Sequence, residues 1–341
     1  MLMNVSFVFR AALGMSLVAF FAGCAVDSSG EPQADENVGE TSEALTTSLV
    51  AWGAPSGLIQ STGNLYWTVN SFNDVTGQYG AAVRRGAKTN TPGAESTLYQ
   101  ETAYAPVRFG DITYANPGVW YGYFVASYGT TSQIKRVPLA GGAAVTLATS
   151  PAMIGDAEVL DNDGTYLYWA DASGLRRMAL GGGAITTLAS LSGIKSVGLD
   201  ASNVYVATGN TVYSVPKGGG ALTWRASGYD ALLAMHVVPG SPTTLYWSER
   251  GGRVAKKPVG GTTTFVYAPT SSYDALSVYF DGSRLLWTEC TSPGWSTCTV
   301  YSKLGSNAPI TWGGGVGAGH LQGDATTVFW GNASALYRAK Y

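Results

Sequence analysis

The stretch from Leu167 to Ser190 reads LYWADASGLRRMALGGGAITTLAS. It contains an aromatic strand, a turn, a second strand that ends in a small residue, a Gly-rich turn and a third strand. Related stretches recur along the chain, and self-similarity at a fixed period is typical of repeat architectures. The clearest other copies are YFVASYGTTSQIKRVPLAGGAAVTLATS (123–150), VYVATGNTVYSVPKGGGALTWRAS (204–227) and LYWSERGGRVAKKPVGGTTTFVYAP (245–269).

The aromatic strands recur at the spacing of propeller blades. Successive equivalent positions are 58, 44, 37, 41, 40 and 43 residues apart, and one propeller blade takes about 40–45 residues. Insertions around Asn70–Gly80 and Asn116–Gly122 explain the first, larger interval. The equivalent positions are Trp67, Val125, Trp169, Val206, Trp247, Trp287 and Trp330.

A further strand precedes each aromatic strand, as in GIKSVGLD (193–200) and ALSVYFD (275–281). Each unit therefore supplies four antiparallel strands, which make one blade. An Asp before a short polar turn accepts hydrogen bonds from its own backbone and tightens a hairpin. Such an Asp is expected to end the preceding strand at Asp161, Asp200, Asp281 and Asp324.

The two ends of the chain complement each other. The last unit stops at Tyr341 after its third strand, whereas Thr46–Trp52 (TTSLVAW) resembles the missing fourth strand. This pattern predicts an all-β, seven-bladed β-propeller in which the N-terminal strand closes the ring within the last blade. Such closure removes a free sheet edge. A six-bladed ring with one degenerate unit is the alternative.

The segment LYWADASG followed by LRRMALGG resembles the YWTD repeats of the low-density-lipoprotein-receptor class B type. It also resembles similar repeats in secreted lipoproteins of myxobacteria. The resemblance covers nearly all of residues 46–341 and implies a propeller fold without implying a particular function. YWTD propellers usually have six blades, whereas seven units are counted here. Only Asp171 fills the fourth motif position, which is elsewhere Val69, Glu249, Glu289 or Asn332.

Residues 1–23 have the features of a signal peptide. Arg10 is the only charge before an apolar run from Ala11 to Gly23, which is too short to span a bilayer as a mature helix. The run ends Phe21-Ala22-Gly23-Cys24, which looks like a bacterial lipobox with Cys24 as the lipidated residue. An ordinary signal peptide with an incidental Cys is the alternative. We expect a bacterial protein anchored by lipid in the cell envelope, most simply the outer membrane, or an extracellular protein.

Residues 24–45 are rich in acidic residues, contain no Lys or Arg and have few large apolar residues. Such a segment buries too little surface to offset its ordering entropy, so we expect a disordered linker before a propeller at 46–341. Cys290 and Cys298 flank a short loop and are expected to form a disulfide outside the cytoplasm. The net charge of −2 disfavours nucleic acid as a partner. We expect a monomer.

The innermost strands should line a central channel, and they contribute Asp111, Asp156, Glu158, Lys195, His236 and His320. If the protein is an enzyme, Asp111, Glu158, His236 and His320 are the catalytic candidates, because a His with carboxylates at a channel mouth suits acid–base chemistry. The other interpretation is that they are ordinary polar residues of a wet channel. No metal-ligand spacing and no cofactor motif occurs.

Basic dyads recur on the strand after each aromatic strand, namely Arg84-Arg85, Lys135-Arg136, Arg176-Arg177 and Lys256-Lys257. They form either a positive ring for an anionic ligand or, as we favour, ion pairs with the Asp residues that end the innermost strands. The function we favour is a non-enzymatic binding or scaffold module for a protein or glycan partner. The alternative is a propeller hydrolase or lyase whose site is the central channel.

Overall fold

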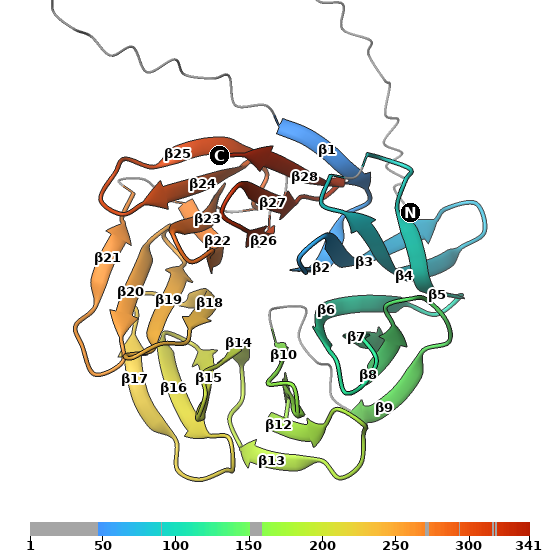
Figure 1. Cartoon of the computed structure of the whole chain (residues 1–341), viewed down its shortest axis with the longest axis horizontal. Helices are drawn as coiled ribbons and strands as arrows, with labels where there is room; N and C mark the ends of the chain where they lie inside the picture. Colours follow the sequence, from blue (N-terminus) through green and yellow to red (C-terminus); the bar gives the residue numbers. More distant parts are fainter. Residues whose placement is uncertain are drawn as a thin grey trace, which may run out of the picture. The chain divides into compact units, whose positions relative to one another are not determined.

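The computed structural model describes residues 47–89, 91–150, 159–269, 273–292, 294–315, 317 and 319–341. These residues form seven antiparallel sheets of four strands each, and Figure 1 shows the sheets arranged as blades around a centre. Seven separate sheets confirm the seven-bladed propeller and exclude the six-bladed alternative. Within the described part of the chain, no helix is long and apolar enough to cross a membrane.

In the first six blades the strands follow in chain order from the centre outward. Blades 1 and 2 are β2 (Pro55–Gln60), β3 (Asn64–Asn73), β4 (Gln78–Ala87), β5 (Ser96–Ala103), and β6 (Val107–Ala115), β7 (Tyr121–Tyr128), β8 (Thr131–Pro138), β9 (Val145–Ser150). Blades 3 and 4 are β10 (Leu160–Asn162), β11 (Tyr166–Asp171), β12 (Gly174–Ala179), β13 (Thr186–Ala189), and β14 (Ile194–Leu199), β15 (Asn203–Thr208), β16 (Thr211–Pro216), β17 (Thr223–Ser227). Blades 5 and 6 are β18 (Leu232–Val238), β19 (Thr244–Glu249), β20 (Val254–Pro258), β21 (Thr264–Tyr267), and β22 (Tyr273–Phe280), β23 (Arg284–Thr291), β24 (Cys298–Leu304), β25 (Ile310–Gly315).

The seventh blade combines strands from both ends of the propeller. Its inner three strands are β26 (Gly319–Gly323), β27 (Thr327–Gly331) and β28 (Ala335–Lys340), and its outer strand is β1 (Thr47–Trp52). Strand β1 runs antiparallel to β28, with Thr47 opposite Ala339 and Ala51 opposite Leu336. The innermost strand β26 contacts β2 of the first blade, so the innermost strands form a continuous circle of neighbours.

Five tryptophans of the aromatic strands are buried between blades. Each is at most 1% exposed, and each lies opposite an apolar residue of the innermost strand of its own blade. Both faces of a blade pack against neighbouring blades, so consecutive residues of these strands are apolar instead of alternating with polar ones. This packing explains the repeated Leu-Tyr-Trp sequence. The five are Trp67, Trp169, Trp247, Trp287 and Trp330.

The second blade corrects one predicted equivalence. Tyr123 lies opposite Arg136 in the same way that Tyr168 lies opposite Arg177. The residue equivalent to Trp169 is therefore Phe124, and not Val125 as the repeat alignment predicts. The reason is a longer β7–β8 hairpin, which changes the number of residues between the aromatic position and the turn. Phe124 is fully buried, as the interblade position requires.

The turn after the innermost strand corrects a second expectation. Asp200, Asp281 and Asp324 each accept hydrogen bonds from backbone N–H groups two and three residues later. In blade 3 this role belongs to Asp163, which accepts from the N–H groups of Thr165 and Tyr166. Asp161 was expected there but lies within β10. The turn begins two residues later because Asp163-Gly164 supplies the turn dipeptide.

The residue two positions after the buried Trp joins consecutive blades. Glu249 accepts hydrogen bonds from Trp247 Nε1 at 2.8 Å and from the backbone N–H of Tyr229 at 3.1 Å, in the segment that arrives from blade 4. Tyr267 on β21 donates to Glu289 at 3.0 Å. These polar contacts tie the outer strand of one blade to the next. Asp171 and Asn332 make comparable contacts with Ser150 and with the Gly314 carbonyl.

Candidate functional site in the central channel

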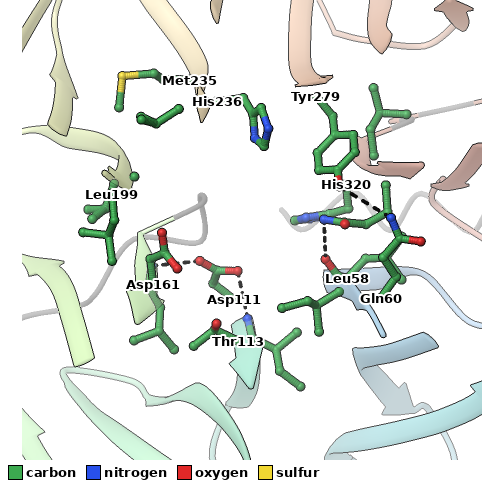
Figure 2. A pocket seen from close by; sticks show the side chains of 18 of the residues that line it. Leu58, Gln60, Asp111, Thr113, Asp161, Leu199, Met235, His236, Tyr279 and His320 are labelled. Carbon is green, nitrogen blue, oxygen red and sulfur yellow. Dashed lines mark hydrogen bonds between the residues drawn. The ribbon is translucent and has the colours of Figure 1, made fainter. Parts of the chain in front are cut away.

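A cavity of about 340 Å³ occupies the channel between the ends of the innermost strands. All seven innermost strands contribute to its wall. Figure 2 shows that its acidic and aromatic side chains point into one common space. Among the described residues that line it, none is Lys or Arg, so its formal charges are acidic. Its polar lining residues are Gln60, Asp111, Thr113, Tyr114, Asp161, His236, Tyr279, His320 and Gln322.

Asp111 lies in an irregular part of β6, where the pairing with β7 shifts between Phe109 and Ile112. Its two carboxyl oxygens accept hydrogen bonds from the backbone N–H groups of Ile112 and Leu160, both at 2.8 Å. Burial raises the pKa of Asp111 to about 7, although these two hydrogen bonds oppose the rise. The charge of Asp161 adds to it.

Asp161 lies on β10, directly after Leu160, whose backbone N–H donates a hydrogen bond to Asp111. Its carboxyl group accepts a hydrogen bond from the Asn162 N–H at 2.7 Å. Burial raises the pKa of Asp161 to about 7, and Lys217 only partly opposes this effect. In Figure 2 the carboxyl groups of Asp111 and Asp161 both point into the cavity. At neutral pH each of these acids is therefore only partly ionised.

The two histidines of the chain both line this cavity. Burial lowers the pKa of His236 to about 4, despite a hydrogen bond with the Phe280 backbone. Burial also lowers the pKa of His320 to about 4. Both rings are therefore neutral at pH 7. The His236 ring lies 4.6 Å from that of Tyr279, centroid to centroid.

His320 has an unusual backbone. It lies in the bulge of β26, with a φ of 49°, which a residue other than Gly rarely adopts. Such outliers are often found at functional sites. The His320 side chain makes no hydrogen bond among the described residues. It also lines a second cavity of about 610 Å³, so it lies between two compartments of the channel.

The structure brings together three of the residues that the sequence nominated for catalysis. Asp111, His236 and His320 line the same cavity. Lys195 lines the second cavity and not the first. Glu158 and Asp156 lie outside the described residues, as do Cys24, the signal peptide at 1–23 and the linker at 24–45.

Sequence reasoning missed several members of the site. Asp161 was assigned to a turn, although Asp163-Gly164 two residues later was the better turn signal. Tyr279 and Gln60 meet across the channel, with 3.5 Å between the Gln60 Nε2 and the Tyr279 hydroxyl oxygen. The Gln60 Oε1 atom is buried without a hydrogen-bond partner. No sequence motif marks these two residues, because their strands are far apart in the chain.

The described residues hold no group of three or more His, Cys, Asp or Glu side chains placed to bind a metal ion. Outside the channel, the Sγ atoms of Cys290 and Cys298 lie 1.98 Å apart, which is disulfide distance.

The basic dyads do not pair as we expected. Arg84, Lys135 and Arg176 form ion pairs with Glu95, Glu101 and Asp171, none of which ends an innermost strand. The arginine that follows each of these three residues contacts the next blade instead. Its side chain donates a hydrogen bond to a backbone carbonyl of that blade. These bonds are Arg85 to Leu139, Arg136 to Leu180 and Arg177 to Lys217, and Arg338 repeats the contact with Lys88. These side chains therefore join blades and do not form a free cationic ring.

No protein-family model matches the chain, and no curated protein matches it. Many solved structures resemble it in fold. Virginiamycin B lyase from Staphylococcus aureus aligns with a TM-score of 0.65 and 12% identity, over 87% of this chain and 99% of that one. The WD40 propeller of Doa1 aligns with a TM-score of 0.63 and 12% identity, over 87% of this chain and 97% of that one. A chain of the mitotic checkpoint complex aligns with a TM-score of 0.60 and 11% identity, over 96% of this chain and 99% of that one. At these identities the likeness shows the β-propeller fold alone, which enzymes and interaction modules share.

Proposed function

We propose that this propeller is a binding module whose central channel recognises a primary ammonium group of a protein or glycan partner. The observation that carries the proposal is the pair formed by Asp111 and Asp161, in a cavity whose described lining contains no Lys or Arg. A cavity lined by one sign of charge attracts ligands of the other sign. Neutral His236 and His320 add no opposing charge.

A bound ammonium group would change the ionisation of Asp111 and Asp161. Burial raises the pKa of Asp111 and Asp161 to about 7. Among the described residues, Asp163 and Lys217 also act on the Asp161 carboxyl group; their Oδ2 and Nζ atoms lie 3.2 Å apart, and neither residue lines the cavity. A bound ammonium would favour the ionised carboxylates and release protons. Affinity should therefore increase as the pH rises through 7.

Isothermal titration calorimetry with two simple probes tests this proposal. The probes are lysine amide, for a protein partner, and glucosamine, for a glycan, and Nα,Nε-diacetyl-lysine amide and N-acetylglucosamine are the neutral controls. We expect lysine amide, whose side-chain amine stays protonated, to bind at pH 7.5 with proton release and at least tenfold more weakly at pH 5.5. We expect glucosamine to bind best near pH 7, where its amine is still largely protonated. Asp161→Asn should weaken binding at least tenfold, whereas Asp74→Asn at an exposed position should not. Equal binding of the acetylated probes would refute ammonium recognition.

The same cavity supports a second candidate function, acid–base catalysis by a hydrolase or lyase. It is favoured by one observation, which is that acids with a pKa of about 7 and neutral imidazoles with a pKa of about 4 share one space. Mass spectrometry of oligosaccharides or peptides incubated with the protein distinguishes the two functions. Cleavage that is lost in Asp111→Asn would establish catalysis, and binding without turnover would favour the binding module.

We further propose that the protein is exported as a bacterial lipoprotein, anchored in the outer membrane through Cys24. The support is the run that ends Phe21-Ala22-Gly23-Cys24, followed by an acidic segment of the kind that tethers a domain. Metabolic labelling with a palmitate analogue should mark the wild type in the membrane fraction and leave Cys24→Ser unlabelled. A wild-type protein that is soluble and unlabelled would disprove the anchor.

A further inference from the structure

We infer that a groove beside the channel binds a pyranose ring, which makes a glycan that carries an amino sugar the partner of this propeller. This inference deepens the proposed function, because it chooses the glycan over the protein. The groove has a volume of about 550 Å³, within the range of ligand pockets. Its walls come from the turn between β2 and β3, the loop between β6 and β7, and the turn after β8.

One wall of the groove is aromatic. Trp120 in the β6–β7 loop is 51% exposed, and its ring lies 5.5 Å from that of Tyr114. The Tyr114 ring lies 6.3 Å from that of Tyr66. The Trp120 carbonyl accepts a hydrogen bond from the Leu139 N–H at 2.9 Å, which ties the loop to the β8–β9 turn. The backbone that carries the exposed indole is therefore anchored before any ligand arrives, which lowers the entropic cost of binding.

Other residues that line the groove are polar. Ser61 and Asn64 form a short turn, in which the Ser61 N–H donates to the Asn64 carbonyl at 2.8 Å. Within the described residues, the Asn64 carboxamide and the Thr62 hydroxyl make no side-chain hydrogen bond. Arg85 donates to the Leu139 carbonyl at 3.1 Å through one of its nitrogens. Donors and acceptors therefore remain available in the groove that the indole lines.

A pyranose fits these two walls together. The C–H groups on one face of the sugar pack against an aromatic ring, while its edge hydroxyl groups donate and accept hydrogen bonds. Trp side chains suit such mixed surfaces because they are large, rigid and partly polar. A purely apolar ligand would leave the polar groups of Asn64 and Thr62 unpaired, at a cost in free energy.

The groove and the channel cavity share part of their wall. Tyr114 lines both spaces, and Gln60 of the channel directly precedes Ser61 of the groove. A glycan long enough to reach from the channel past Tyr114 would place one sugar ring at Asp111 and Asp161 and another at Trp120. This shared wall favours a chain of linked sugars over a single isolated one.

Three probes test the inference by calorimetry at pH 6.5, where amino sugars keep much of their ammonium charge, namely a β-1,4-linked glucosamine tetramer, its fully N-acetylated form and a tetralysine peptide. We expect the glucosamine tetramer to bind at least tenfold more tightly than glucosamine itself. Trp120→Ala should remove most of this gain and leave the affinity for glucosamine unchanged. Asn64→Ala should reduce tetramer affinity by a smaller factor. Trp52→Ala is the matched control, since Trp52 is 60% exposed and does not line the groove.

The outcomes separate this inference from the proposed function. If Trp120→Ala binds the glucosamine tetramer like the wild type while Asp161→Asn does not, the groove is refuted and ammonium recognition stands. If tetralysine binds as tightly as the glucosamine tetramer and depends equally on Trp120, the partner is a protein and the inference is overturned. If the acetylated tetramer binds through Trp120 while no probe depends on Asp161, the groove stands and the proposed function fails.

Discussion

Replacing Asp161 by Asn should stabilise the protein at alkaline pH. Burial raises the pKa of this carboxyl group from an ordinary value of 3.8 to about 7. Between these two values the folded state holds more protons than the unfolded state, so the free energy of unfolding falls as the pH rises through this window. The ionised carboxylate is therefore a cost to the folded protein above pH 7, and Asn removes it.

The expected gain in the free energy of unfolding follows from the rise in the pKa of Asp161. A rise of about three pKa units corresponds to about 4 kcal/mol at 1.36 kcal/mol per unit. The surface of Asp161 is only partly buried, and solvent therefore screens its charge, so we expect a gain of about 1–3 kcal/mol at pH 8. Near pH 4 the gain should largely vanish, because folded wild-type Asp161 is then protonated.

Urea denaturation followed by tryptophan fluorescence at pH 4.5 and pH 8 measures this difference. Asp74→Asn at an exposed position controls for the removal of one negative charge. If Asp161→Asn is no more stable than the wild type at pH 8, the argument from burial is wrong. The same substitution is expected to weaken ammonium binding at least tenfold, so stability and binding should change in opposite directions.

Two further substitutions and one deletion test the fold. Glu249→Ala leaves the buried indole N–H of Trp247 and the backbone N–H of Tyr229 without an acceptor and should cost about 2–4 kcal/mol in urea denaturation, whereas Asp74→Ala should cost little. His320→Gly should melt at a higher temperature than His320→Ala, because Gly tolerates the φ of 49° at a saving of about 1 kcal/mol. Deleting residues 47–52 exposes the edge of β28, so size-exclusion chromatography should show association or aggregation, and a stable monomer would contradict the role of β1.

The sequence by itself determined the architecture. The repeat of aromatic strands predicted seven blades, with six as the alternative, because each blade must bury the same aromatic position against its neighbours. The seven sheets confirm the larger number. The unmatched strand at Thr46–Trp52 indicated where the last blade obtains its outer strand, and β1 pairs with β28. These features are local or periodic, so a single chain reveals them.

The contents of the channel were decided only by the tertiary structure. Asp111 and Asp161 are fifty residues apart and meet because the innermost strands of blades 2 and 3 are neighbours. Side chains alternate along a strand, so a shift of one residue moves a side chain to the other face. Bulges at Asp111 and His320 introduce such shifts. The position of Asp161 within β10, and of its carboxyl group in the channel, therefore depended on contacts between distant strands that no local pattern records.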